Sequence, residues 1–416
     1  MINKALKSKV FSNSIYLYIL QIFNTIIPLL TLPYITRILG DDQYGIFSKM
    51  LNYVIYLQAV VEYGFNLAGA RKISLCNSEN ERNKIFSSIM YSRMLLFLLS
   101  SVIIGILLFF VAETPTHRLC MLILSLLLVG EVFTQTWFLQ GLQHMKVIML
   151  ISVISRSLST LCIFLFVNNV SDLLLYAVLY VVTNLLTAGV GTIIVIHKFN
   201  ARLLKFDFVN VKNSLQDGWP LFTTSFASKV CSGFAITVLG MFCSDAVVGG
   251  YSAIQKIPYI LVMLFAPIAQ ALYPYICRLY VENTARGVKA LKILAMCILS
   301  ICLVGVLLLI FMRSLIIEVL YGTEYIQYSN LIIPLACWLF FSIANNFLGI
   351  QILVARGYQK QYSRCFMISL LILVALNLLG GYLFGASGVA IATMLGEGVL
   401  TIACFIVILK NNLLKI

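Results

Sequence analysis

The chain contains 416 residues, of which 61% are hydrophobic and only 11% are charged. A water-soluble protein of this length could not hide so much apolar surface, because its exterior must be largely wetted. The formal net charge of +14 would suit a protein that binds nucleic acid. The positions of the charges along the chain, described below, favour a membrane protein instead.

Apolar stretches of about 20 residues recur along the whole chain. A helix needs this length to cross the hydrocarbon core of a bilayer. The sequence therefore predicts an all-α integral membrane protein with about twelve spanning helices. In chain order, these spans are expected near residues 12–36, 46–70, 85–111, 119–142, 147–167, 172–197, 219–241, 246–276, 287–312, 329–354, 363–384 and 388–409.

Prolines fall inside two of these spans. Pro28 and Pro33 lie in the first span, and Pro258, Pro267 and Pro274 lie in the eighth. Because proline removes a backbone hydrogen bond, we expect it to interrupt or bend both helices.

Lys and Arg residues are distributed unevenly between the two sides of the spans. With the amino terminus inside, the inner segments hold 21 of the 29, the spans hold five, and the outer loops hold only Arg37, Arg118 and Arg313. Basic residues accumulate in the cytoplasmic loops of membrane proteins. Both termini are therefore predicted to be cytoplasmic, and no nucleic-acid partner is expected.

The metal-binding residue types show no pattern of ligands. The eleven cysteines are scattered without a CxxC pair, and the three histidines, His117, His144 and His197, are far apart in the sequence. Cysteine in apolar helices commonly behaves as a small hydrophobic residue. We predict no metal site, no cofactor and no disulfide.

Two pairs of short motifs indicate that the chain consists of two similar halves. A shift of 204 residues aligns Asp-x-x-x-Gly-x-Phe-Ser at 41–48 with Asp-x-x-x-Gly-x-Tyr-Ser at 245–252. A second echo links Gly-Leu-Gln at 141–143 with Gly-Tyr-Gln at 357–359. Each pair occupies the same place in its half, which makes a chance match the poorer explanation.

Six spans in each half place the two halves in the same orientation in the membrane. Such parallel repeats build two-lobed carriers, in which a cavity lies between the lobes. We predict two six-helix bundles, residues 1–205 and 206–416.

Eight ionisable residues fall inside the predicted spans: Lys49, Glu62, Arg93, Glu131, Arg156, Lys229, Lys256 and Glu397. Each would cost roughly 2.5–3.5 kcal/mol at the centre of a lipid-facing helix. Most must therefore face water, a partner charge or the interior of the bundle. The five cations outnumber the three acids, which favours an anionic substrate.

Four of the cations lie on broad polar helix faces, and we predict that Lys49, Arg156, Lys229 and Lys256 line the central cavity. Arg93 and Glu62 would instead extend to the interface or pair structurally. Two interpretations stay open for Glu131 and Glu397. In one interpretation, these two carboxyl groups join neighbouring helices by hydrogen bonds. In the other, they bind and release protons and so couple transport to a proton gradient.

Several segments resemble the polysaccharide flippases of O-antigen gene clusters (the Wzx type). The likeness rests on Arg-Ile-Leu-Gly at 37–40, Tyr-Gly-Ile-Phe-Ser at 44–48, Tyr-Gly-Phe-Asn-Leu at 63–67, Arg-Lys-Ile-Ser at 71–74, Gly-Tyr-Ser-Ala at 250–253, Lys-Ile at 256–257 and Pro-Ile-Ala-Gln-Ala-Leu-Tyr-Pro at 267–274. It covers the whole chain in length and span count. One departure is Gln255, where an acid would be expected before Lys256.

The resemblance implies a non-enzymatic carrier with the fold of the multidrug and oligosaccharidyl-lipid exporter superfamily, in the bacterial inner membrane. It would flip an undecaprenyl-diphosphate-linked oligosaccharide from the cytoplasmic to the periplasmic leaflet by alternating access. The O-antigen polymerase and the chain-length regulator are further partners that it suggests. The sugars would need hydroxyl and amide partners, for which we nominate Asn24, Tyr53, Tyr56, Asn345 and Asn346.

Sequence features also argue against two rival functions. A drug antiporter of this fold would be expected to present acids to its cavity, where this chain has lysines. An O-antigen polymerase or membrane glycosyltransferase could use Asp41 and Asp42 as an acidic pair. Such an enzyme generally needs a sizeable outer loop, whereas the longest hydrophilic connections of this chain are inside.

Overall fold

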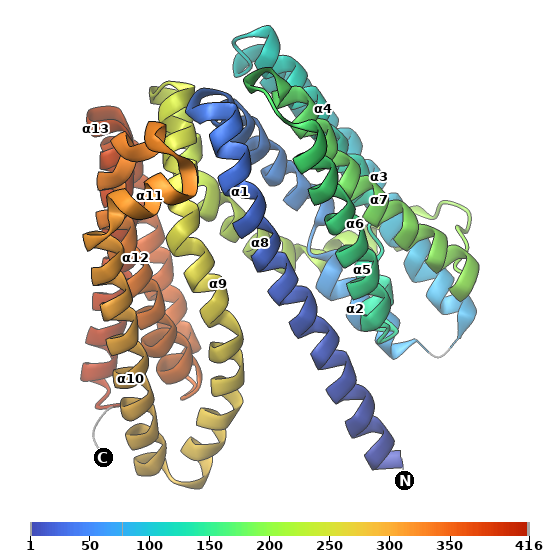
Figure 1. Ribbon diagram of the computed structural model, residues 1–416. Coiled ribbons are helices and arrows are strands. Elements are labelled where there is room, and N and C mark those ends of the chain that lie inside the picture. Colours follow the sequence, from blue (N-terminus) through green and yellow to red (C-terminus); the bar gives the residue numbers. More distant parts are fainter. Residues whose placement is uncertain (1, 77, 414–416) are drawn as a thin grey trace. The chain divides into compact units, whose positions relative to one another are not determined.

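The computed structural model describes residues 2–76 and 78–413, and this part of the chain is helical and contains no β-strand. Figure 1 shows the helices. In chain order they are α1 (Ile2–Glu62), α2 (Phe65–Leu75), α3 (Glu79–Phe110), α4 (Pro115–Phe133), α5 (Thr136–Gly141), α6 (Met145–Phe166), η1 (Val170–Asp172), α7 (Leu173–Phe199), α8 (Phe208–Phe242), α9 (Asp245–Glu282), α10 (Thr284–Phe311), α11 (Arg313–Tyr321), η2 (Thr323–Leu331), α12 (Ile332–Asn345), η3 (Asn346–Val354) and α13 (Gln359–Lys410).

Two of the helices are each two spans joined at a glycine. Gly40 breaks α1 with φ 71° and ψ 177°, and Gly385 breaks α13 with φ 56° and ψ −136°. These left-handed conformations favour glycine, because it has no Cβ. Ten helices are long and apolar enough to span a membrane in the described residues, and the glycine breaks divide two of these ten. The predicted fold class is confirmed.

The expectation for the prolines was only partly right. Helices α1 and α9 continue through Pro28 and Pro33 and through Pro258, Pro267 and Pro274. The sharp break of the first helix falls at Gly40, outside the proline region. A helix tolerates proline when neighbouring groups satisfy the freed carbonyl, whereas the dihedral angles of Gly40 lie outside the helical region altogether.

The described chain forms two compact units. Within the described residues, unit 1 comprises 2–39, 46–76 and 78–233, and unit 2 comprises 40–45 and 234–413. This division by packing falls inside α8, and the predicted domains, residues 1–205 and 206–416, stay a prediction. The first half of α8 belongs to unit 1 because Ser214 bonds to Ser88 of α3 and Gly218 packs directly on Tyr63. The division into two six-helix bundles itself stays a prediction.

Unit 1 is built from pairs of closely packed helices. Helix α4 packs against α7, α6 packs against α7, and α2 packs against α5. Glycines allow the last contact, since a Cβ at Gly69 would overlap the Trp137 ring and one at Gly141 would press on Ile73. Trp137 itself is fully buried.

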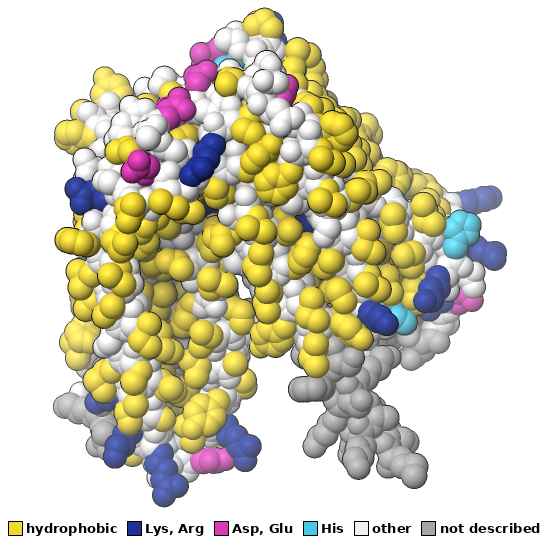
Figure 2. All heavy atoms as spheres, viewed as in Figure 1, with side chains coloured by type: hydrophobic (Ala, Val, Ile, Leu, Met, Phe, Trp, Pro, Cys, Tyr) yellow, Lys and Arg dark blue, Asp and Glu magenta, His cyan; other side chains and the backbone are white. Residues whose placement is uncertain are grey.

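Unit 2 is a bundle in which α12 packs against α13, α10 and α9. Figure 2 shows apolar side chains covering the middle of these helices, while Lys and Arg gather at the end where α9 and α10 meet. Exposed side chains such as Leu303, Leu371 and Ile402 are those of a surface that faces lipid. These Lys and Arg side chains lie at the end of the bundle that is predicted to face the cytoplasm.

The two copies of the repeated motif contact each other within unit 2. A Cβ on Gly45 would overlap the backbone carbonyl of Asp245, and a Cβ on Gly249 would overlap the carbonyl of Asp41. The contact is reciprocal, as expected when two copies of one motif meet around a local two-fold axis. Glycine is required at both positions because the two backbones approach more closely than a side chain permits.

Candidate functional site

A buried arginine organises the polar interior of unit 1. Arg93 of α3 has no exposed surface. Its Nη1 donates hydrogen bonds to the backbone carbonyls of Glu131 at 2.9 Å and Thr134 at 2.7 Å, and its Nη2 donates to Oδ1 of Asn66 at 3.3 Å. The carboxylate of Glu131 lies 3.9 Å from Nη2. Of the two alternatives that the sequence left open for Arg93, this environment favours structural pairing over extension to the membrane interface.

The arginine contacts the place where a spanning helix breaks. Helix α4 ends at Phe133, and the chain resumes as α5 at Thr136. The last carbonyls of a helix lack partners within the helix, and inside a membrane they must be satisfied by protein. Arg93 donates to the carbonyl of Glu131 in the last turn of α4 and to that of Thr134, the residue that follows the helix, so its positive charge stabilises the end of α4.

Two further charges join this pair. Glu62 lies close enough to act on the charges of both Arg93 and Glu131, and Lys229 of α8 acts on the charge of Glu131. Two cations and two carboxylates thus compensate each other within unit 1. Lys229, predicted to line the central cavity, lies within electrostatic reach of Glu131.

The polar face of the second part of α1 holds α8 in place. Nδ2 of Asn52 donates to the carbonyl of Gly233 at 3.1 Å, and the hydroxyl of Tyr56 donates to the carbonyl of Val230 at 3.3 Å. Tyr53 lies beside Tyr56 and is half-buried. Gly233 has no room for a Cβ, which would overlap Asn52 and Tyr56. Tyr56, predicted to contact sugar, contacts the backbone of α8.

The remaining predicted cations have different surroundings. Lys49 is buried, with its Nζ 3.5 Å from Oε1 of Glu113. Arg156 of α6 is half-buried beside Tyr180 of α7. In unit 2, Lys256 is an exposed residue, and its Nζ lies 6.0 Å from the ring centroid of Tyr259.

These differences sort the four cations. Lys49 and Lys229 each have a carboxylate nearby. Within the described residues, no carboxylate oxygen lies within 4 Å of Arg156 or Lys256. Lys229 has no carboxylate oxygen within 4 Å either, but Arg156 and Lys256 are the two of the four on whose charge no carboxylate of the described residues acts. The predicted convergence of all four on one cavity stays a prediction.

Unit 2 holds a half-buried carboxylate with an amide. Nδ2 of Asn345 donates to the backbone carbonyl and to Oε1 of Glu397, each at 3.0 Å. Nε2 of Gln351 donates to the carbonyl of Ala269 at 2.9 Å and to Oδ1 of Asn346 at 3.5 Å. Gln351 lies in η3, a π-helical segment. Glu397 thus joins two helices, as one of the two interpretations proposed.

The helix irregularities of the two units contain matching glutamines. The shift of 216 residues that aligns Gly141 with Gly357 also aligns Gln135 with Gln351. Both side chains are almost wholly buried, and in each one Oε1 has no hydrogen-bond partner within the described part of the chain. This glutamine pair was not predicted from the sequence, although the second repeat motif indicates the shift that aligns the two residues.

Asn24, predicted to contact sugar, lies in the first part of α1. It is half-buried, and its Oδ1 is buried without a hydrogen-bond partner among residues 2–76 and 78–413. The same described residues contain no group of three His, Cys, Asp or Glu side chains that could hold a metal ion.

Solved structures with the same fold include a lipid flippase and a multidrug resistance transporter. The chain is similar to lipid II flippase MurJ in an inward-closed conformation, with a TM-score of 0.73, 16% identity, and coverage of 97% of this chain and 89% of that one. It is also similar to an inward-facing multidrug resistance MATE family transporter of the MOP superfamily (TM-score 0.62, 16% identity, 93% and 97% coverage). The chain has the fold of a polytopic helical membrane transporter.

The sequence identifies the family within that class. Residues 10–280 match the family described as Polysaccharide biosynthesis protein, and the chain belongs to it. A relative from Escherichia coli (strain K12), provisionally named O-antigen transporter, is 29% identical over 97% of both chains. A relative from Shigella dysenteriae with the same name is 27% identical over 92% of this chain and 96% of its own. The predicted family and the location in the bacterial inner membrane are confirmed.

Proposed function

We propose that the chain flips a lipid-linked oligosaccharide of the O-antigen type from the cytoplasmic to the periplasmic leaflet. The observation that carries this proposal is the similarity to relatives named O-antigen transporter, which extends over 97% of both chains in the Escherichia coli case. The exporter fold and the membership of the polysaccharide biosynthesis family support it. Undecaprenyl diphosphate is the lipid that the sequence resemblance implies.

The distribution of charges suits a phosphorylated headgroup. Arg156 and Lys256 have no carboxylate within 4 Å among the described residues, so a diphosphate could supply their missing counter-charge. Arginine can bind phosphate in a bidentate manner, whereas lysine acts as a point charge. The lipid tail can remain in the bilayer, and only the headgroup needs a polar path.

We infer that the chain is not an enzyme. The acidic pair that a polymerase or glycosyltransferase could use includes Asp41, which is buried. Its Oδ2 accepts hydrogen bonds from the hydroxyl of Tyr328 at 2.8 Å and from Nε2 of Gln327 at 3.2 Å. A carboxylate held in this way stabilises the contact between α1 and η2 and is poorly placed to act as a catalytic base. The polymerase and chain-length regulator stay predicted partners.

Deletion and complementation test the proposed function. We expect a strain lacking the gene to lose surface polysaccharide and to accumulate lipid-linked repeat units on the cytoplasmic side, and the wild-type gene to reverse both. Loss of display without accumulation inside would point to a polymerase. Unchanged display together with sensitivity to drugs would support the antiporter.

Variants of the two uncompensated cations test the substrate class. Arg156→Ala and Lys256→Ala should each reduce the rate of display about tenfold, because a hydrogen bond to a charged group contributes about 1.5–3 kcal/mol. Lys289→Ala, an exposed lysine near the start of α10, is the matched control. Each variant must be inserted in the membrane at the wild-type level. Wild-type display from both variants would remove the anionic headgroup from the proposal.

A further inference from the structure

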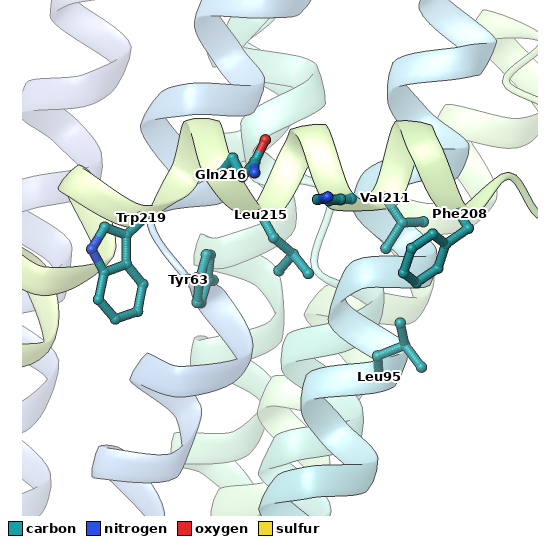
Figure 3. Close-up of a pocket in the computed structure, with 8 residues that line it drawn as sticks. Tyr63, Leu95, Phe208, Val211, Leu215, Gln216 and Trp219 are labelled. Carbon is teal, nitrogen blue, oxygen red and sulfur yellow. The ribbon is translucent and has the colours of Figure 1, made fainter.

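The first half of α8 lies on unit 1 as a surface helix before it enters the bundle. Residues 200–207 precede it and are fixed to α3 by hydrogen bonds: the hydroxyl of Tyr91 donates to the carbonyl of Leu204 at 2.9 Å, and Oγ of Ser87 accepts from the amide of Leu204 at 2.8 Å. Asp207 then accepts from the amide of Val209 at 2.9 Å and caps the helix. Figure 3 shows residues 208–219 running across the neighbouring helices.

One face of this segment forms a groove. A cavity of about 280 Å³ is lined by Tyr63 and Leu95 together with six residues of α8: Phe208, Val211, Lys212, Leu215, Gln216 and Trp219. The α8 residues follow the spacing of a single helix face. Figure 3 shows Leu215, Val211 and Phe208 directed towards Leu95 of α3.

The groove is apolar and open to its surroundings. Phe208 is 67% exposed, Trp219 is 55% exposed and Leu95 is 44% exposed. Helices that lie in the plane of the membrane surface present aromatic and aliphatic residues to the acyl chains and basic residues to the headgroups. The first half of α8 has this composition, with Lys212 beside the aromatic residues.

Further basic residues line a second cavity beside the start of α8. A second, more polar cavity of about 390 Å³ lies between α3 and the start of α8, and Lys84 and Lys205 are among its lining residues. The segment 198–212 contains four Lys or Arg residues and lies on the predicted cytoplasmic side. Anionic lipids of the cytoplasmic leaflet attract such clusters by about 1 kcal/mol for each Lys or Arg.

We propose that this groove is a binding site for an anionic phospholipid of the cytoplasmic leaflet. One acyl chain lies between Leu95 and Leu215, and the phosphate is bound by Lys212. The exposed apolar lining and the adjacent lysines are complementary to the two parts of such a lipid. Because the site lies on the surface of unit 1 and involves none of the predicted cavity cations, it does not depend on which cargo the protein carries.

The size of the groove distinguishes this occupant from the proposed cargo. Pockets for small ligands typically enclose about 300–1,000 Å³, so 280 Å³ holds part of one aliphatic chain and no oligosaccharide. Apart from Lys212 and Gln216, the lining is aliphatic or aromatic. A sugar headgroup would find few hydrogen-bonding partners there.

The first experiment measures how lipids stabilise the purified protein in detergent. Thermal unfolding is followed by a thiol-reactive dye, since the described cysteines are free. We expect added phosphatidylglycerol to raise the unfolding midpoint more than phosphatidylcholine does. Lys212→Glu should lose at least half of that difference, whereas the matched charge reversal Lys289→Glu, in unit 2, should keep it. An undiminished difference in Lys212→Glu would overturn the proposal.

The second experiment needs no variant. Phosphatidylglycerol with a photoreactive acyl chain is incorporated into vesicles that contain the wild-type protein, and the labelled peptides are identified by mass spectrometry. We expect labelling to concentrate on residues 208–219 and around Leu95. Labelling spread evenly over the lipid-facing helices would contradict a specific site. Displacement by undecaprenyl phosphate but not by unlabelled phosphatidylglycerol would assign the groove to the cargo lipid and also overturn the proposal.

Discussion

The fourth span of unit 1 and the corresponding span of unit 2 are both irregular, but they are stabilised differently. In unit 1, α4 ends inside the span and Arg93 donates hydrogen bonds to the freed carbonyls. In unit 2, the chain passes from α12 into the π-helical η3 without ending, and the side chain of Gln351 donates to Ala269 of α9. The same problem of unsatisfied backbone groups in a membrane is solved by a cation in one half and by an amide in the other.

The comparison shows which features the repeat retains and which it does not. The glycines of the two motifs and the buried glutamines, Gln135 and Gln351, occur in both halves. The charges differ, since Arg93 has no basic counterpart at the second irregularity. Irregular backbone at this depth is therefore common to both halves, whereas its dependence on charge is specific to unit 1.

Removing the arginine should produce the largest effect. Arg93→Met removes three hydrogen bonds and leaves Glu131 without its closest cation, and breaking a buried ion pair costs about 3–5 kcal/mol. We expect a lower thermal unfolding midpoint in detergent and weaker protection of the Thr134–Gln135 amides in hydrogen exchange. Arg93→Lys should recover only part of the loss, because one ammonium group cannot reproduce the geometry of the guanidinium. A wild-type midpoint for Arg93→Met would contradict the assigned role.

The two repeat glycines should respond alike. Gly45→Ala and Gly249→Ala each place a Cβ on a backbone carbonyl, and overpacking of this kind costs about 1–3 kcal/mol. Gly305→Ala is the control, since nothing lies within 4 Å of its Cβ. Thermal unfolding of the three variants checks the expectation. A strong effect at only one motif glycine would show that the contact is not reciprocal.

Neutralising the acids separates structural roles from proton coupling. Glu131→Gln should cost about 1–2 kcal/mol, because Arg93 keeps its carbonyl partners but loses part of its compensating charge. Glu397→Gln should cost less, since its amide oxygen can still accept from Asn345. Polysaccharide display measured beside the unfolding midpoint distinguishes the two roles. Abolished display at an unchanged midpoint would favour proton coupling, and full display would exclude it.

The smallest effect is expected at the amide of unit 2. Gln351→Leu loses one interhelical hydrogen bond, which contributes about 0.6 kcal/mol in a membrane protein, and it also removes an oxygen that has no partner among the described residues. We expect a midpoint within about 2 °C of the wild-type value. If Gln351→Leu lowered the unfolding midpoint as much as Arg93→Met does, the two helix irregularities would be equally sensitive to the loss of their hydrogen-bond donors.

Much of the fold follows from the sequence because the bilayer imposes it. Span length, the inner excess of Lys and Arg, and the repeat motifs depend on composition and local order, which sequence shows directly. The break at Gly40 is less visible, because a glycine gives no indication of its dihedral angles until the neighbouring helices are known. Pro28 and Pro33 seemed stronger signals, yet the helix continues through both.

The partners of the charges were the least predictable part. Helical spacing places Lys49 and Lys229 on polar faces, but it cannot show that Glu113, from the loop between α3 and α4, approaches Lys49 or that Glu131 of α4 lies within electrostatic reach of Lys229. Arg93 looked like a residue at the end of a span, and its contact with the broken end of α4 joins positions 38 and 41 residues apart. Such contacts depend on packing between helices.

Reconstituted flipping tests the central claim most directly. Vesicles containing the purified protein and a lipid-linked oligosaccharide in both leaflets are treated with a glycosidase that cannot enter. We predict that wild-type protein makes nearly all of the cargo accessible, whereas empty vesicles protect the inner half and Arg156→Ala slows the exposure about tenfold. Protection of the inner half in vesicles that contain correctly folded wild-type protein would contradict the account.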